Sequence, residues 1–180
     1  MSEAATLTPE ALLEALIFAA PQPVSVKDLA AAAGMPMDTA EAALENLEHR
    51  LSQGGLRLQR SRDRLQLVSA PEAAPAVEAL LGLDVTVRLT QASMETLAIV
   101  AYAQPVTRPQ VESIRGVSSD STLRTLLTAG LIEETGRAES LGRPIIYATT
   151  FEFLQQFGLE RPDDLPPLKP GENPEAKASV

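Results

Sequence analysis

The chain has 180 residues and a formal net charge of −9, and it is poor in the residues that build chemical sites. It holds no Cys, no Trp and a single His. These counts exclude a disulfide framework, a thiolate nucleophile, a Cys-built zinc site and a pair of His metal ligands, so we expect no cofactor. An acidic chain also lacks the attraction for phosphates that most nucleic-acid-binding domains have.

The hydropathy pattern predicts no membrane or secretory address. Residues 1–8 contain no basic residue and no apolar core, unlike a signal peptide. The longest apolar stretches, 11–20 and 97–103, are too short to cross a bilayer. We therefore expect a cytoplasmic protein with no membrane partner.

An internal repeat divides the chain into two similar parts. The residues at 22–25 (QPVS) recur at 104–107 (QPVT), which is an offset of 82. The repeat predicts one domain over residues 1–83 and a second over residues 84–159. Further matches at this offset are Leu29 with Val111, Gly34 with Gly116, Asp38 with Asp120, and Leu44 with Leu126.

The first copy begins with three predicted helices. Thr8 and Pro9 start the first, whose apolar residues recur at helical spacing. Residues 25–28 have the pattern of a capping box and start a second, short helix that ends at Gly34. Asp38 is expected to cap the third helix.

After the third helix the apolar period changes to two. Residues 56–60 and 65–69 alternate around Arg62 and Asp63, which predicts a β-hairpin. A linking helix is expected from about residue 71 to residue 83.

The second copy repeats this order and ends differently. Its hairpin is predicted at 131–135 and 145–149 with a longer turn, followed by a short helix over 150–157. Residues 160–180 hold five of the 14 prolines and little to bury, so we expect a disordered acidic tail. The order of helix, short strand, two helices and hairpin indicates two tandem winged-helix domains. The fold class is therefore mainly α with small β-hairpins, an α+β class.

Several strings of the second copy resemble one family. These strings are ETLAIVAYAQPVTRPQVESIRGV (95–117), Ser119-Asp120, LRTLL (123–127), Gly130-Leu131-Ile132, GRPIIYATT (142–150), Phe153-Leu154 and Phe157-Gly158-Leu159. The resemblance is to segregation and condensation protein B (ScpB); it covers roughly residues 9–159 and is strongest over 94–159. It implies a tandem winged-helix homodimer that binds the kleisin ScpA and, through it, an SMC protein.

Direct DNA binding is the alternative, because winged helices often place the third helix in the major groove. In the first copy, residues 38–53 carry four acidic residues against one Arg, and in the second, residues 118–130 are neutral. Neither has the charge of a DNA-reading helix. The first hairpin leaves two interpretations open, a weak salt-sensitive phosphate contact or pairing with the acidic third helix, and we favour pairing. Its four Arg are Arg57, Arg60, Arg62 and Arg64.

The residues favour a binding protein over an enzyme. No phosphate-binding loop or nucleophile elbow is present, and no His lies near the Ser and Thr pairs to activate a hydroxyl. Most of the aromatic residues fall in the second copy, where a core role is favoured over a partner groove. Arg143, in the second turn, is either a partner contact or a locally packed residue.

We therefore predict a non-catalytic adaptor of an SMC–ScpA–ScpB complex that acts in chromosome condensation and segregation at the nucleoid. The alternative is a transcriptional regulator that uses the Arg-rich hairpin. Any DNA contact of the adaptor is expected to be weak or indirect. The residues predicted for dimerisation are Leu12, Leu13, Leu16 and Leu29, and those for kleisin binding are Leu131, Ile132, Arg143, Ile145 and Tyr147.

Overall fold

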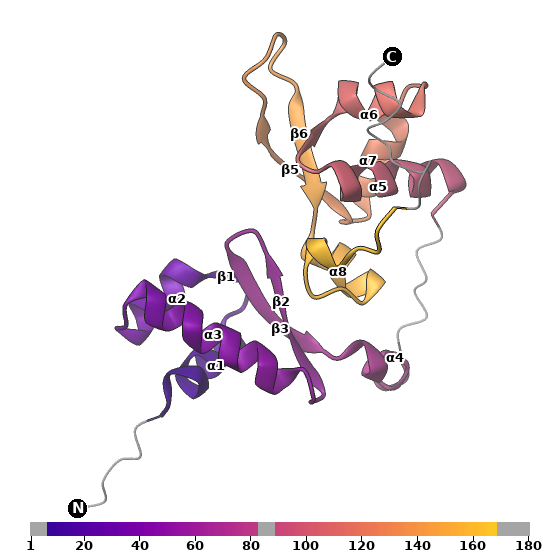
Figure 1. Ribbon diagram of the computed structural model, residues 1–180. Helices are drawn as coiled ribbons and strands as arrows, with labels where there is room; N and C mark the ends of the chain where they lie inside the picture. The colour runs from indigo at the N-terminus through magenta and orange to yellow at the C-terminus, as the bar shows by residue number, and fades with distance from the viewer. Residues whose placement is uncertain (1–6, 83–88, 169–180) are drawn as a thin grey trace, which may run out of the picture. The chain divides into compact units, whose positions relative to one another are not determined.

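The structure, a computed structural model, describes residues 7–82 and 89–168 (Figure 1). The chain divides into two compact units, Met1–Leu83 and Asp84–Val180. Among the described residues, none of the helices combines the length and the apolar character that crossing a bilayer requires.

The first unit is a three-helix bundle closed by a small antiparallel sheet in the strand order β1-β3-β2. Residues Arg62 and Asp63 join β2 to β3, and Arg62 has a positive φ of 55° in this tight turn. The elements are α1 (Pro9–Ala19), β1 (Val24–Ser25), α2 (Val26–Ala33), α3 (Met37–Leu51), β2 (Leu56–Ser61), β3 (Arg64–Ser69), the 3-10 turn η1 (Pro71–Ala73) and α4 (Ala74–Leu81).

Two of the three predicted helix starts in this unit are confirmed. The Thr8 hydroxyl accepts the N–H of Ala11, and the Ser25 hydroxyl accepts the N–H of Asp28 at 3.1 Å. The third is wrong, because α3 begins at Met37, two residues earlier than a cap at Asp38 requires, and its N-cap Pro36 makes no side-chain cap. Asp38 instead lies in the first turn, where the helix dipole favours a negative charge.

The core of the first unit lies between the helices and the sheet. Five leucines are among the largest fully buried side chains, and each contributes about 1.5–3 kcal/mol by leaving water. These leucines come from α1, α2, α3 and β3, so the core draws on both the helices and the sheet, and α4 adds none of them. They are Leu13, Leu29, Leu44, Leu47 and Leu65.

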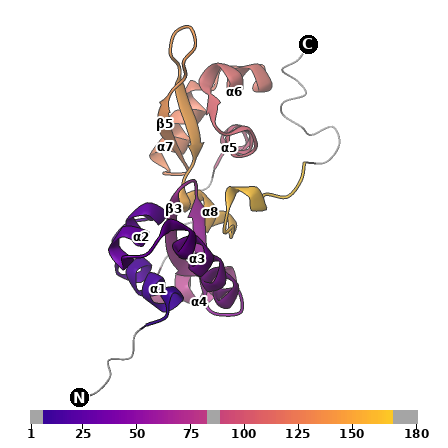
Figure 2. The ribbon, with the colours of Figure 1, turned by 60° about the vertical axis from the view of Figure 1, so that its left-hand side comes forward.

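The second unit repeats the first, with the sheet order β4-β6-β5. Strands β1 and β4 and helices α2 and α6 correspond at the offset of 82 residues, so the repeat and both winged-helix folds are confirmed. The loop between β5 and β6 projects beyond the helices of its own unit (Figures 1 and 2). The elements are α5 (Gln91–Ala103), β4 (Val106–Thr107), α6 (Arg108–Arg115), α7 (Asp120–Thr128), β5 (Ile132–Arg137), β6 (Ile145–Thr149), α8 (Phe151–Phe157) and the 3-10 turn η2 (Pro162–Asp164).

The segment after α8 is ordered against the second core, so the predicted disorder is wrong for residues 160–168. Leu159 and Leu165 pack on the core cluster, and the Tyr102 hydroxyl donates a 2.7 Å hydrogen bond to the carbonyl of Pro166. The Asp164 carboxylate accepts the N–H of Arg161 and closes the η2 turn. Leu159 and Leu165 thus hold in place a Pro-rich segment that the amino-acid composition had led us to assign to the tail. Residues 169–180 of the predicted tail lie outside the described residues.

Candidate functional site

The outer face of α1 is an apolar surface that its own unit leaves uncovered. Apart from Glu10 and Glu14 the helix is apolar around its whole circumference, yet it buries two side chains, Leu13 and Ile17. Phe18 is 80% exposed, and Ala15 and Ala19 beside it are exposed as well. A helix that is hydrophobic all round is normally buried, so this face has the character of an interface.

Helix α5, which holds the same place in the second unit, is covered. It buries Ser93, Thr96, Leu97, Ile99, Val100 and Ala101. Its apolar side chains share one core cluster with Phe153 and Leu154 of α8. The segment after α8 reaches the end of this helix, where the carbonyl of Pro166 accepts the hydrogen bond from Tyr102 of α5. Helix α5 is therefore packed by α6, α7 and β6, and the C-terminal segment of its own chain adds a contact at its last turn.

The Arg-rich hairpin of the first unit is engaged locally. Arg57 is 12% exposed, donates to the carbonyls of Leu51 and Gly54, and pairs with Glu72. Arg60 makes a two-pronged contact with Glu41 of α3, at 2.8 and 2.9 Å. This is the pairing with the third helix that we favoured for Arg60. Arg62 and Arg64 lie exposed at the hairpin tip.

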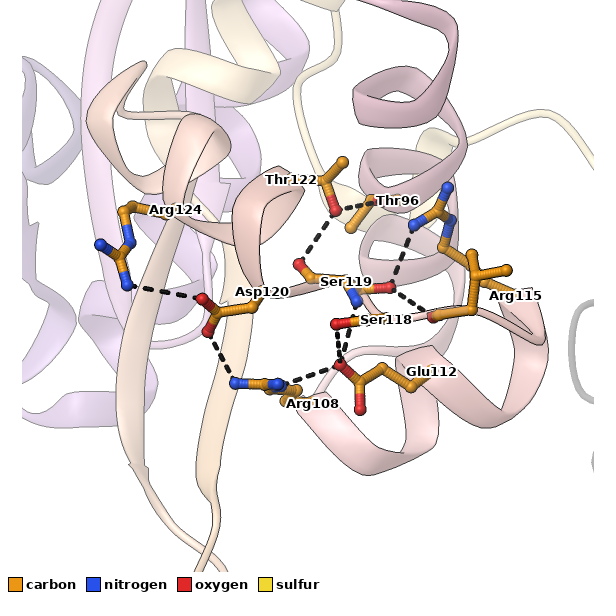
Figure 3. A network of polar contacts seen from close by, with 10 residues as sticks. Thr96, Arg108, Glu112, Arg115, Ser118, Ser119, Asp120, Thr122 and Arg124 are labelled. Atoms are coloured by element: carbon orange, nitrogen blue, oxygen red, sulfur yellow. Dashed lines mark hydrogen bonds and ion pairs between the residues drawn. The ribbon is translucent and has the colours of Figure 1, made fainter.

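A polar network ties α6 to α7 and α5 in the second unit (Figure 3). Arg108 lies between two carboxylates, 2.9 Å from Glu112 and 2.6 Å from Asp120. Glu112 also accepts the backbone N–H of Ser119, a fully buried residue at the start of α7. The network fixes the turn between α6 and α7. Its members are Thr96, Arg108, Glu112, Arg115, Ser118, Ser119, Asp120, Thr122 and Arg124.

The surroundings of Glu112, Arg108 and nearby Tyr147 shift the pKa values of these three groups. The hydrogen bond from the Ser119 N–H, and after it the one from Arg108, lowers the pKa of Glu112 below its ordinary value. The hydrogen bond to Glu112 in turn raises the pKa of Arg108. Burial, reinforced by nearby Glu134, raises the pKa of the Tyr147 phenol. All three groups therefore keep their usual charge near neutral pH, which suits a structural lock rather than proton transfer.

The outer face of α7 carries a shallow open hollow of about 620 Å³. Asp120 and Arg124 form an i,i+4 pair at its edge, and the hydroxyls of Thr125 and Thr128 bond back to their own helix. The side chains of Arg124, Thr125 and Thr128 thus have hydrogen-bond partners within α7 itself. Residues on three of its turns line the hollow: Asp120, Ser121, Arg124, Thr125, Thr128 and Ala129.

The predicted dimerisation residues divide between core and surface. Leu13 and Leu29 fill the core of their own unit, with 0% and 2% exposed, so they are not surface contacts. Leu12 and Leu16 are half-buried on α1. Sequence reasoning missed Phe18, because the apolar spacing identified the core side of α1 but did not say which apolar residues on its other side stay uncovered. The informative signal was the near absence of polar residues on α1.

The predicted kleisin-binding residues divide in the same way. Leu131, Ile132 and Tyr147 are buried in the second core, so the sequence assigned core residues to the surface. Ile145 is half-buried, and Arg143 is exposed in the β5–β6 loop with a positive φ of 42°. The sequence also missed the Arg108 network, whose signal was the i,i+4 spacing of Arg108 and Glu112.

The aromatic residues follow the core interpretation in part. Tyr147 and Phe153 are buried, whereas Phe157 is 43% exposed with its ring centroid 4.8 Å from that of Phe153.

Comparisons with known proteins agree on one family. The model of the segregation and condensation complex subunit ScpB matches residues 11–168. Segregation and condensation protein B of Carboxydothermus hydrogenoformans is 45% identical, over 88% of this chain and 86% of that protein. The protein of the same name from Desulforamulus reducens is 46% identical, over 87% of each chain.

Solved structures of this family also match. ScpB from Mycobacterium tuberculosis is 38% identical over 86% of this chain and 99% of that chain, with a TM-score of 0.40. A dimer of an ScpB N-terminal domain complexed with an ScpA peptide is 26% identical over 44% of this chain and 100% of that chain, with a TM-score of 0.39. The family model and the identities over most of both chains show that this chain belongs to the ScpB family of segregation and condensation complex subunits.

Proposed function

We propose that the chain is a non-catalytic adaptor that dimerises through its first unit and binds an ScpA-type kleisin through its second. Through the kleisin it joins an SMC protein in a condensin-like complex, in the cytoplasm at the nucleoid, where it supports chromosome condensation and segregation. The observation that carries this function is the family match over residues 11–168.

Dimerisation is supported by the bare face of α1. Phe18 exposes 80% of its surface, and an exposed aromatic side chain is typical of the centre of a protein interface. Ala15 and Ala19 beside it are small enough to let a second helix approach closely. Leu12 and Leu16, the two predicted residues that stay half-buried on α1, lie further around the helix from Phe18, beyond Ala15 and Ala19.

Kleisin binding by the second unit is supported by its long β5–β6 loop. Leu141 at its tip is fully exposed, Arg143 lies two residues further on, and Ile145 begins β6 half-buried. An apolar side chain beside an exposed guanidinium suits a partner segment that is apolar and acidic. Three residues of the second core support these strands from the buried side: Leu131, Ile132 and Tyr147.

A direct role in DNA binding has less support. Arg57 and Arg60 already pair with Glu72 and Glu41, so phosphate contact would have to break those pairs. Helix α3 presents acidic residues, which oppose a polyanion.

Copurification tests the proposal. The full chain should coelute with an ScpA kleisin fragment on a sizing column and should shift little DNA at physiological salt. Arg60→Glu combined with Arg62→Glu should leave kleisin binding and dimerisation unchanged. Failure to coelute, or tight sequence-selective DNA binding by the isolated protein, would overturn the adaptor function.

A matched pair of variants tests the second-unit loop. Arg143→Glu should weaken kleisin binding by about tenfold, because it reverses the charge beside Leu141. Arg64→Glu reverses an exposed Arg in the other hairpin and serves as the control. Equal affinity of the two variants for the kleisin would remove Arg143 from the interface.

A further inference from the structure

Helix α4 is an apolar element that its own unit does not use. Seven of its eight residues are apolar, and none of its eight side chains, all of which the structure describes, is buried. Leu80 and Leu81 are 83% and 61% exposed. A short helix of this composition gains little stability in water by itself, since helices of fewer than about 12 residues depend on packing.

The internal repeat shows what an element in this position does. In each unit a helical segment begins two residues after the last strand, at Pro71 after β3 and at Phe151 after β6. Both segments end in a left-handed glycine, Gly82 or Gly158. In the second unit this segment is α8, which buries Phe153 and Leu154 in the core cluster that includes α5. The first unit therefore has a helix that corresponds to α8, namely α4, and a first helix that corresponds to α5, namely α1. Both of these helices expose apolar side chains.

We propose that α4 of one copy packs on the bare α1 face of a second copy, by reciprocal exchange. This inference rests on the proposed dimerisation through the first unit and identifies what occupies the α1 face. A two-fold dimer contains two α4-on-α1 contacts and so covers all four exposed surfaces at once. The second unit builds the equivalent cover within its own chain.

The size of the interface also favours a second element. A standard interface needs about 20–30 residues a side, whereas α1 has 11 residues and is about 16 Å long. One face of such a helix supplies a quarter or so of that number. Adding the eight residues of α4 extends the apolar surface without adding a charge other than Glu78.

Crosslinking tests this geometry directly, because the chain has no Cys of its own. The double variant Ala15→Cys with Ala79→Cys places one thiol on α1 and one on α4, both at exposed positions. A short bis-maleimide should convert it to a covalent dimer. The control, Ala42→Cys with Ala79→Cys, moves the first thiol to an exposed position on α3 and should stay uncrosslinked.

Mixing the single variants separates the possible occupants. Ala15→Cys mixed with Ala79→Cys should give a covalent dimer that contains one chain of each kind. A bridge within one chain of the double variant would show that α4 covers its own α1, and a covalent dimer from Ala15→Cys alone would show that α1 pairs with α1; either result overturns the exchange. Light scattering on the same samples distinguishes these failures from loss of the dimer, since a dimer without the α1–α4 bridge overturns the exchange alone.

A second variant avoids crosslinking chemistry. Leu80→Ser with Leu81→Ser should weaken dimerisation by at least about tenfold, because it removes two apolar side chains that would be buried against α1 of the second copy. It should leave the monomer's thermal unfolding unchanged, since α4 buries nothing within its unit. Unchanged dimer affinity would contradict the proposal and would fit cover of α4 by the second unit of the same chain.

Discussion

Helix α5 of the second unit buries six side chains, whereas α1 of the first unit, in the same place in the same fold, buries two. The two units also differ in the segment that each carries after its last strand. After β6, α8 and residues 158–168 add Phe153, Leu154, Leu159 and Leu165 to the core cluster. After β3, α4 adds nothing. One repeated fold thus yields one unit whose core includes the segment after its last strand and one unit that leaves apolar residues of α1 and α4 exposed.

The comparison also bears on the adaptor function that we propose. A winged-helix unit of about 80 residues buries only a modest fraction of its surface, so any apolar helix that it leaves uncovered is available for association. The second unit uses its extra segment for its own stability, and its long loop is the contact surface that we propose for the kleisin. The first keeps its extra helix exposed.

The largest expected effect comes from removing the α8 anchor. Leu154→Ala, at a fully buried position, should lower the stability of the second unit by about 2–5 kcal/mol. Tyrosine fluorescence in a denaturant titration measures this unit selectively, because Tyr102 and Tyr147 both lie in it. Leu81→Ala on α4 is the matched control and should leave the tyrosine transition unchanged. Equal losses would contradict the contrast between α8 and α4.

The cap of α8 should matter less. The Thr150 hydroxyl accepts the N–H of Phe153 and donates to the carbonyl of Gly130 at 2.6 Å. Thr150→Ala should cost about 1 kcal/mol in the same titration, whereas Thr150→Ser keeps the hydroxyl and should cost less. A full loss with Thr150→Ser would assign the effect to the methyl group rather than the cap.

The Arg108 network predicts a pH dependence that is specific to the second unit. Because the folded state lowers the pKa of Glu112, its contribution is complete above the ordinary glutamate pKa and is lost as the pH falls through the lower, folded-state value. Glu112→Gln should therefore flatten the fall in tyrosine-detected stability below about pH 4.3. The exposed Glu152→Gln is the control, and an identical pH slope for wild type and Glu112→Gln would contradict the assignment.

The smallest effect is expected in the first hairpin. Arg60 and Glu41 form a partly exposed pair, which is worth less than about 1 kcal/mol. A double-mutant cycle of Arg60→Ala and Glu41→Ala, monitored by circular dichroism, should give a coupling of this size. A coupling of zero would leave Arg60 available for other contacts and would reopen the question of DNA contact.

The sequence was sufficient where local chemistry decides the structure. The caps at Thr8 and Ser25 rest on partners three positions away, and the hairpins and the repeat rest on the order and alternation of residue types along the chain. The start of α3 failed because Asp38 can occupy a cap or a first turn with similar benefit.

The candidate surfaces were harder to predict, since an apolar pattern does not say which apolar residues another segment covers. Leu13 and Leu131 are core residues, whereas Phe18 is exposed, and all three are equally apolar. Order in residues 160–168 depends on contacts with distant α5, which composition does not reveal. The contrast between α1 and α5 required the two units to be compared in three dimensions.

The mass of the full chain in solution tests the central claim most directly. Light scattering over a range of concentrations should give twice the 19.2 kDa of one chain for the wild type and a single chain mass for Phe18→Glu at the same concentration. The charged side chain would lie at the centre of an apolar interface, whereas in the monomer it replaces an exposed residue. A wild-type chain that stays monomeric throughout, or a Phe18→Glu variant that dimerises as tightly as the wild type, would contradict the account.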